Sequence, residues 1–155
     1  LAFAFAALSA CSSNASAGSL TRTMNVAASA DEVWAAIGSF CAIKDWHPMI
    51  ATCDTDGKTP PTRTLVTKDG KATFVETEMA RDDAKRLYSY NFVSSPLPVP
   101  KYLATIRVVP AGAHAATIVW HGEYSAAPGK SASVKATLAS IYETGLKALK
   151  AKFAQ

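Results

Sequence analysis

Apolar and polar residues alternate along much of the chain after the first twenty residues, with the two-residue period of strands that bury one face. The alternation is clearest over residues 87–93 and 101–109, which flank a segment with three prolines in five positions, 96–100. These prolines cannot lie inside a sheet, because each lacks the N–H that a strand ladder requires. We therefore expect a stiff loop that projects from the end of the sheet, either as part of a pocket rim or only as a long hairpin connection.

The same period predicts further strands, separated by turn signals such as Asp69-Gly70 and the segment 110–112. The predicted strands span residues 20–26, 51–56, 63–68, 73–81, 87–93, 101–109 and 116–125.

Helical patterns occur directly after the first strand and again at the end of the chain. Ser29 is a suitable N-cap for a first short helix, and residues 42–46 form a second one. The clearest helix covers residues 131–153, with apolar positions three or four apart, and either Ser131 or Ser133 is expected to cap it.

The predicted order of elements is one strand, two short helices, six strands and one long helix, with no internal repeat and no second domain. A helix with a single apolar face must lie across the sheet to bury that face. We therefore expect an α+β helix-grip fold, in which a curved antiparallel sheet of six to seven strands surrounds the long C-terminal helix. Because a curved sheet cannot pack flush along the whole helix, a cavity is expected between the two.

The first 21 residues carry no charge, and the first ten are almost wholly apolar. This run is too short for an ordinary membrane-spanning helix and is typical of a secretory leader. Two processing sites fit the sequence: a lipobox that ends in Cys11, which would be acylated, or a cleavage site after Ala17. We favour the lipobox. Either alternative predicts a leader over residues 1–18, an exported domain over residues 19–155, and a periplasmic or lipid-anchored protein in a bacterial envelope.

In an exported protein, Cys41 and Cys53 would lie in an oxidising compartment, where a cysteine pair suggests a disulfide. An unstrained bridge would contribute roughly 3 kcal/mol to stability. The alternative is two separate buried thiols. No spacing of Cys and His residues suggests a zinc site, and neither a metal nor another cofactor is expected.

Charge is divided unevenly along the chain. Residues 1–83 carry seven Lys/Arg and ten Asp/Glu, whereas residues 84–155 carry nine and two. No basic run or motif is typical of a nucleic-acid-binding protein, so no nucleic acid partner is expected. The basic second half could meet an acidic periplasmic protein or an anionic membrane surface, or it could simply be a solvated, lysine-rich helix face.

Five local motifs coincide with those of a known superfamily. They are residues 30–34 (Ala-Asp-Glu-Val-Trp), residues 45–48 (Asp-Trp-His-Pro), Glu76, residues 96–102 (Pro-Leu-Pro-Val-Pro-Lys-Tyr) and Val119-Trp120. With this element order, the chain resembles the START-type, birch-pollen-allergen-like helix-grip superfamily (SRPBCC), and within it the polyketide cyclase/dehydrase-like branch. An exported form is similar to the small periplasmic accessory proteins of methanol oxidation. The resemblance implies a structural role for Glu76 at a cavity entrance, but the fold hosts carriers, receptors and enzymes alike.

Each of several aromatic residues is, by itself, better explained as ordinary core. As a set they are rich in hydroxyl groups for a plain core, which favours a cavity where they line the wall and orient a ligand. These ligand-binding candidates are Trp46, Phe74, Tyr88, Tyr90, Tyr102, Trp120, Tyr124 and Tyr142. Leu97, in the proline-rich loop, is expected to contact the ligand at the cavity entrance. His47 and Glu76 are the candidate acid–base groups.

Three functions fit these observations. The first is a binder or carrier of a hydrophobic small molecule. The second is a polyketide cyclase/dehydrase-like or hydrolase-like enzyme that uses His47 and Glu76. The third is a periplasmic accessory protein that acts through protein contacts. We favour the first, because the sequence has no serine–histidine–acid order, no glycine-rich phosphate loop and no metal triad.

Overall fold

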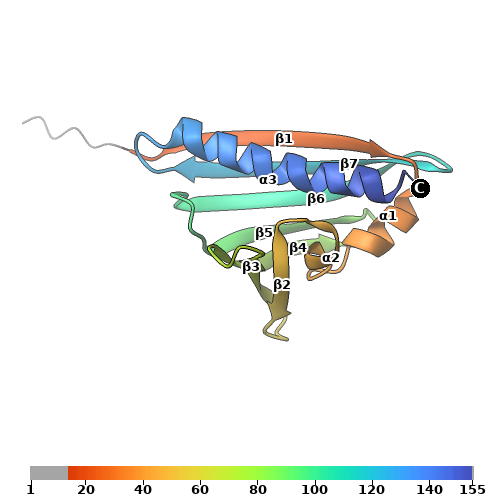
Figure 1. The fold of residues 1–155 in the computed structure, drawn as a ribbon, viewed down its shortest axis with the longest axis horizontal. Coiled ribbons are helices and arrows are strands. Elements are labelled where there is room, and N and C mark those ends of the chain that lie inside the picture. The colour runs from red at the N-terminus through yellow and green to blue at the C-terminus, as the bar shows by residue number, and fades with distance from the viewer. Residues whose placement is uncertain (1–13, 155) are drawn as a thin grey trace, which may run out of the picture.

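The computed structural model describes residues 14–154. Seven strands form one antiparallel sheet in the order β1-β7-β6-β5-β4-β3-β2, with the long helix α3 lying along it (Figure 1). The elements are β1 (Ser16–Val26), α1 (Ala30–Ile37), α2 (Ile43–Trp46), β2 (Ile50–Thr55), β3 (Thr62–Thr67), β4 (Thr73–Asp82), β5 (Leu87–Ser94), β6 (Lys101–Gly112), β7 (Ala115–Ala126) and α3 (Ser131–Lys152). The predicted helix-grip α+β fold is confirmed.

Helix α3 lies beside the β1–β7 side of the sheet, while β4, β3 and β2 continue the sheet toward its other end (Figure 1). Its buried face is formed by residues spaced three or four apart, as the sequence pattern predicts: Val134, Leu138, Tyr142, Gly145, Leu146 and Leu149. The C-terminal half of this face packs tightly. A Cβ atom on Gly145 would lie 2.6 Å from the ring of His47, so glycine allows the segment after α2 to approach the helix closely.

The start of α1 confirms the predicted N-cap. Ser29 has extended backbone, and its hydroxyl accepts a hydrogen bond from the backbone N–H of Glu32 at 3.3 Å. The Glu32 carboxylate in turn accepts from the Ser29 backbone N–H at 2.8 Å, which completes a capping box. This reciprocal pair fixes the turn that leads from β1 into α1.

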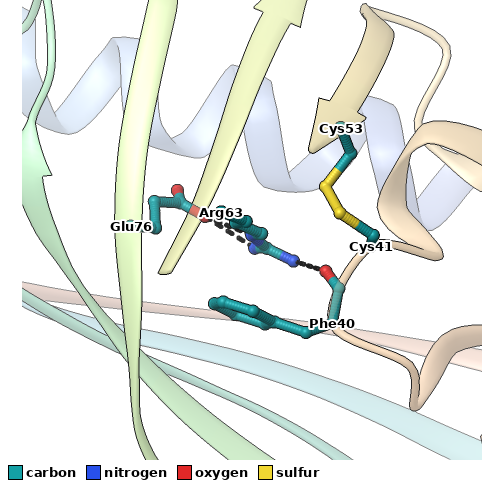
Figure 2. The surroundings of a disulfide bond; sticks show 5 residues. All are labelled: Phe40, Cys41, Cys53, Arg63 and Glu76. Carbon is teal, nitrogen blue, oxygen red and sulfur yellow. Dashed lines mark hydrogen bonds and ion pairs between the residues drawn. A yellow bond between two sulfur atoms is a disulfide. The ribbon is translucent and has the colours of Figure 1, made fainter. Parts of the chain in front are cut away.

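The disulfide is also present. Cys41, in the segment after α1, is bonded to Cys53 of β2, with the two Cα atoms 5.5 Å apart. The bridge attaches the helical segment to the far edge strand of the sheet and lies beside the buried Arg63 (Figure 2).

Three local predictions are corrected by the structure. Strand β1 begins at Ser16 and not near residue 20, because its first residues pair with the end of β7. The turn predicted over residues 110–112 lies at residues 113 and 114, because the β6–β7 ladder continues past Pro110 through a register shift.

The third correction concerns the start of α3. Neither Ser131 nor Ser133 is the N-cap: Lys130 takes that position with helical backbone and without a side-chain cap. The Ser133 hydroxyl donates instead to the Lys130 carbonyl at 2.9 Å. A serine caps a helix only from an extended backbone position, where its oxygen can reach the first free N–H groups.

Within residues 14–154, no helix is long and apolar enough to cross a membrane. Cys11, the predicted lipidation site, lies outside the described residues.

Candidate functional site

A cavity of about 490 Å³ lies between the sheet, the N-terminal half of α3 and the β5–β6 loop. Its wall is mostly apolar and comes from α2, the segment after it, the six strands β2 to β7 and α3. The lining residues are Ile43, His47, Met49, Ile50, Leu65, Thr67, Ala72, Phe74, Glu76, Tyr90, Phe92, Pro96, Leu97, Tyr102, Trp120, Ala136, Thr137, Leu138, Ser140, Ile141 and Tyr142.

The proline-rich loop lies at this cavity, as predicted for residues 96–100. Pro96 and Leu97 line it, with Pro96 exposed and Leu97 half-buried. Met49, Ala136, Thr137 and Ser140 also line the cavity and are exposed to solvent. These exposed lining residues mark the mouth, whose rim is apolar at Met49 and Pro96 and small or polar on α3.

Tyrosine hydroxyls form a polar cluster inside the cavity. The hydroxyls of Tyr102 and Tyr142 are 2.5 Å apart, and the indole N–H of Trp120 donates to the Tyr90 hydroxyl at 3.0 Å. The rings of Trp120 and Tyr142 are stacked, with centroids 4.3 Å apart. Burial raises the pKa of Tyr90 and of Tyr102 well above the ordinary value, so these hydroxyls stay protonated.

Gly122 of β7 makes room for this cluster. A Cβ atom at this position would overlap the Tyr142 hydroxyl. Any larger residue would therefore push the helix away from the sheet at the level of the tyrosine pair.

Glu76 lines the cavity and forms a buried ion pair with Arg63, a residue that the sequence analysis did not select. The Arg63 side chain is fully buried, and both its Nε and its Nη2 lie 2.7 Å from Glu76 Oε2. Nη1 donates to the carbonyl of Phe40 (Figure 2). Arg63 therefore joins β3, β4 and the segment before the disulfide. Glu76 has a structural contact, but its partner is Arg63 on the adjacent strand, and only Arg63 reaches the loop at Phe40.

The guanidinium of Arg63 also lies over aromatic rings, 4.0 Å from the Phe40 centroid and 5.0 Å from that of Tyr90. Burial alone would lower the pKa of Arg63, but the adjacent Glu76 carboxylate raises it above the ordinary value. Burial raises the pKa of Glu76, and the Arg63 charge opposes that shift.

His47 is held by hydrogen bonds on both ring nitrogens. Nε2 lies 3.0 Å from the carbonyl oxygen of Ile141, and Nδ1 accepts from the backbone N–H of Met49 at 3.3 Å. This pattern fixes the neutral ring with its proton on Nε2, and burial lowers the pKa of His47. The imidazole therefore connects the segment after α2 to α3, and neither nitrogen is free to exchange a proton with a substrate.

Most of the predicted site residues surround one cavity, but three do not line it. Those brought together are His47, Phe74, Glu76, Tyr90, Leu97, Tyr102, Trp120 and Tyr142. Tyr88, expected further inside, is buried in edge contact with Phe40 at 5.7 Å, on the α1 side of the sheet. Trp46 packs behind the wall against Trp120. Tyr124 pairs with Gly18 of β1 near the end of the sheet, and its ring lies over that glycine.

The sequence analysis missed several lining residues. Phe92 continues the alternation of Tyr88 and Tyr90, so its period was a usable signal. Leu65 and Thr67 share a face of β3 with Arg63, which the alternation also indicated. The exposed residues of α3 at the mouth carried no such signal, because they are small or polar.

Among residues 14–154, no group of three or more His, Cys, Asp or Glu side chains is arranged to hold a metal ion.

A curved antiparallel sheet around a long C-terminal helix, with an apolar cavity between them, defines the START-like helix-grip class of proteins. The chain belongs within it to the family described as polyketide cyclase / dehydrase and lipid transport, whose model matches residues 17–154. Family and fold together indicate hydrophobic ligand binding or cyclase activity. A search of curated proteins finds no match.

Solved structures agree with this assignment. The chain is similar to the XoxI protein of Bacillus cereus, with 29% identity and a TM-score of 0.82 over 87% of this chain and 94% of that one. It is similar to an uncharacterised protein of Bacillus thuringiensis, with 29% identity and a TM-score of 0.84 over 89% of this chain and 100% of that one. The ZhuI aromatase/cyclase of Streptomyces sp. R1128 shares the fold at 16% identity and a TM-score of 0.75, over 88% of this chain and 93% of that one.

Proposed function

We propose that the protein is an exported binder or carrier of a hydrophobic small molecule, which it holds in the cavity between the sheet and α3. The observation that carries this proposal is the cavity itself, a largely apolar space of about 490 Å³. Pockets for small molecules typically measure about 300–1,000 Å³ and are predominantly apolar with few polar groups. The size and lining of this cavity fit that description.

The state of the two candidate acid–base groups favours binding over catalysis. His47 uses both ring nitrogens in hydrogen bonds to the backbone, and Glu76 is ion-paired with Arg63. General acid–base catalysis needs a group that can exchange its proton with the substrate. A cyclase/dehydrase-like enzyme would have to break a backbone contact to use His47, and in Glu76 it would have a carboxylate whose charge is already paired with Arg63.

Export is part of the proposal and is supported by the uncharged, apolar start of the chain. Processing at Cys11 would leave β1 whole, whereas cleavage after Ala17 would remove the first two residues of that strand. We therefore propose lipidation of Cys11 and attachment of the domain to a bacterial membrane through that anchor.

The proposal is tested by titrating the protein with a neutral hydrophobic fluorophore, N-phenyl-naphthylamine. The wild-type protein should bind it in a saturable way. Leu97→Asp should weaken binding roughly tenfold, because an apolar rim contact is replaced by a charge. The melting temperature should hardly change, since Leu97 is only half-buried.

Val93→Asp is the matched control, because Val93 is 62% exposed and does not line the cavity. It should leave probe binding unchanged. If the wild-type protein does not bind the probe, the carrier proposal is wrong. Native mass spectrometry of protein purified from its own cell envelope adds an independent result: a retained organic ligand supports a carrier, whereas an empty cavity and a co-purifying acidic protein indicate an accessory role.

A further inference from the structure

One oxygen of Glu76 is left for a ligand. Both nitrogens of Arg63 that pair with Glu76 contact the same oxygen, Oε2. Figure 2 shows the other oxygen, Oε1, turned away from the guanidinium, and no hydrogen-bond donor of residues 14–154 reaches it. Glu76 is 4% exposed and lines the cavity, so this oxygen is a hydrogen-bond acceptor that a ligand in the cavity can use.

The tyrosine cluster supplies the complementary donor. The Tyr102 and Tyr142 hydroxyls are 2.5 Å apart, so one of their two hydrogens serves this contact and the other is left over. The Tyr90 hydroxyl accepts from Trp120, and its own hydrogen is not used in that bond. Tyr90, Tyr102 and Tyr142 line the same cavity as Glu76, so the cluster and the carboxylate border one space.

The net charge of the cavity wall decides what else can enter. Arg63 is behind the lining, its charge is balanced by Glu76, and His47 is held neutral. No Lys or Arg of the described chain lines the cavity. An anionic ligand would therefore meet the free oxygen of Glu76 and no cation in the wall to pair with its own charge, and it would lose its hydration on entry.

Resting on the proposed function, we infer that the cavity selects an uncharged, largely apolar molecule with one hydroxyl group, and rejects a carboxylate of similar shape. A hydroxyl can donate to Glu76 Oε1 and accept a tyrosine hydrogen, so it complements both kinds of group. A carboxylate only accepts. The aromatic walls formed by Phe74, Phe92 and Trp120 favour a planar ring system in the rest of the ligand.

Four naphthalene derivatives substituted at the same ring position test this inference by calorimetric or fluorescence titration. At about pH 7, naphthol and naphthamide are neutral and can donate, the methyl ether of naphthol can only accept, and naphthoate is ionised. We expect naphthol to bind at least about tenfold more tightly than naphthoate, because a hydrogen bond to a charged acceptor is gained and a repulsion is avoided. Naphthamide should bind like naphthol, and the ether more weakly.

Glu76→Gln should change this order. The glutamine keeps the shape and can still accept from Arg63 through its carbonyl oxygen, but it turns an N–H₂ donor toward the cavity. The preference for naphthol over naphthoate should fall below about threefold or reverse. Glu78→Gln is the matched control: Glu78 is also buried and paired with an arginine, Arg81 at 2.7 Å, but it does not line the cavity. Its ligand order should match the wild type.

The outcomes separate the two proposals. If the wild-type protein binds N-phenyl-naphthylamine but binds naphthoate as tightly as naphthol, the selectivity inference is overturned and the carrier proposal stands. If neither N-phenyl-naphthylamine nor any naphthalene derivative binds, the carrier proposal itself fails. If Glu76→Gln shows no cooperative unfolding transition in a thermal melt, the ligand series on the wild-type protein tests the selectivity inference by itself. That series varies the charge and the donor capacity of the ligand without altering the protein.

Discussion

Replacement of Arg63 by methionine is the sharpest test of what holds the sheet and the disulfide segment together. Arg63 is fully buried, pairs with Glu76 and donates to the Phe40 carbonyl. Methionine fills a similar apolar volume but supplies neither the charge nor the donor. The variant therefore leaves a buried carboxylate without its counter-charge and a buried carbonyl without that donor.

The expected loss of stability is large. Removing one partner of a buried ion pair typically costs about 3–5 kcal/mol, and an orphaned buried carbonyl costs about 1–3 kcal/mol. These costs overlap, so we expect about 4–6 kcal/mol for Arg63→Met. Because a domain of this kind is stable by only about 5–15 kcal/mol, the variant should be close to unfolding at neutral pH.

The pH dependence identifies the cause. Burial already raises the pKa of Glu76, and the Arg63 charge is what opposes that shift, so Arg63→Met should raise the pKa further. A group whose pKa is higher in the folded than in the unfolded state stabilises the fold at low pH. This stabilisation is lost as the pH rises through the pKa of the folded state. Urea denaturation should therefore show that the deficit of Arg63→Met shrinks by roughly 2–3 kcal/mol between about pH 7 and pH 5.

The double variant Arg63→Met/Glu76→Leu is the matched control, because it removes both charges. Replacing a buried ion pair by apolar residues often leaves stability unchanged or increases it. The unfolding free energy of the double variant should therefore lie within about 2 kcal/mol of that of the wild type. A deficit of Arg63→Met below about 1 kcal/mol, or one equal to that of the double variant at every pH, would refute the unpaired-charge argument.

Two further predictions concern the disulfide and the cavity wall. In exported protein that is denatured without reduction, thiol titration should detect neither Cys41 nor Cys53, and two reactive thiols would contradict the bridge. Replacing both cysteines with serine should lower the unfolding free energy in urea by roughly 3 kcal/mol. Trp120→Ala should cost about 3–5 kcal/mol and also weaken N-phenyl-naphthylamine binding, since Trp120 is 2% exposed and stacks on Tyr142; an unchanged denaturation midpoint would contradict its role in the wall.

Local sequence patterns were sufficient for the elements and their order. The alternation in Leu87–Ser94 and Lys101–Gly112, the four-residue spacing in α3 and the cap at Ser29 each depend on residues close together in the chain. The predicted start of α3 at residue 131 was correct, but the predicted capping serine was wrong, because Lys130 is the N-cap and adopts helical backbone. The choice between neighbouring polar residues depends on how the preceding turn enters the helix.

The sequence also determined that an apolar face of α3 must cover a curved sheet, and from this a cavity followed. It placed Leu97, Tyr90 and Trp120 near that cavity correctly. It could not separate Tyr90 from Tyr88 and Tyr124, which have the same residue type and strand period. Twist and register decide where along a strand an inward-facing side chain meets the helix, and neither is encoded in the alternation.

Only the tertiary structure decided the chemistry of the site. Arg63 and Glu76 lie on adjacent strands as directly paired residues, and this pairing, with the Phe40 carbonyl, turned a candidate catalytic carboxylate into half of a structural ion pair. His47 lost its candidate role in the same way, through a contact with Ile141 far along the chain. A titratable residue can be recognised from its type alone, but its availability depends on partners that folding brings from distant positions.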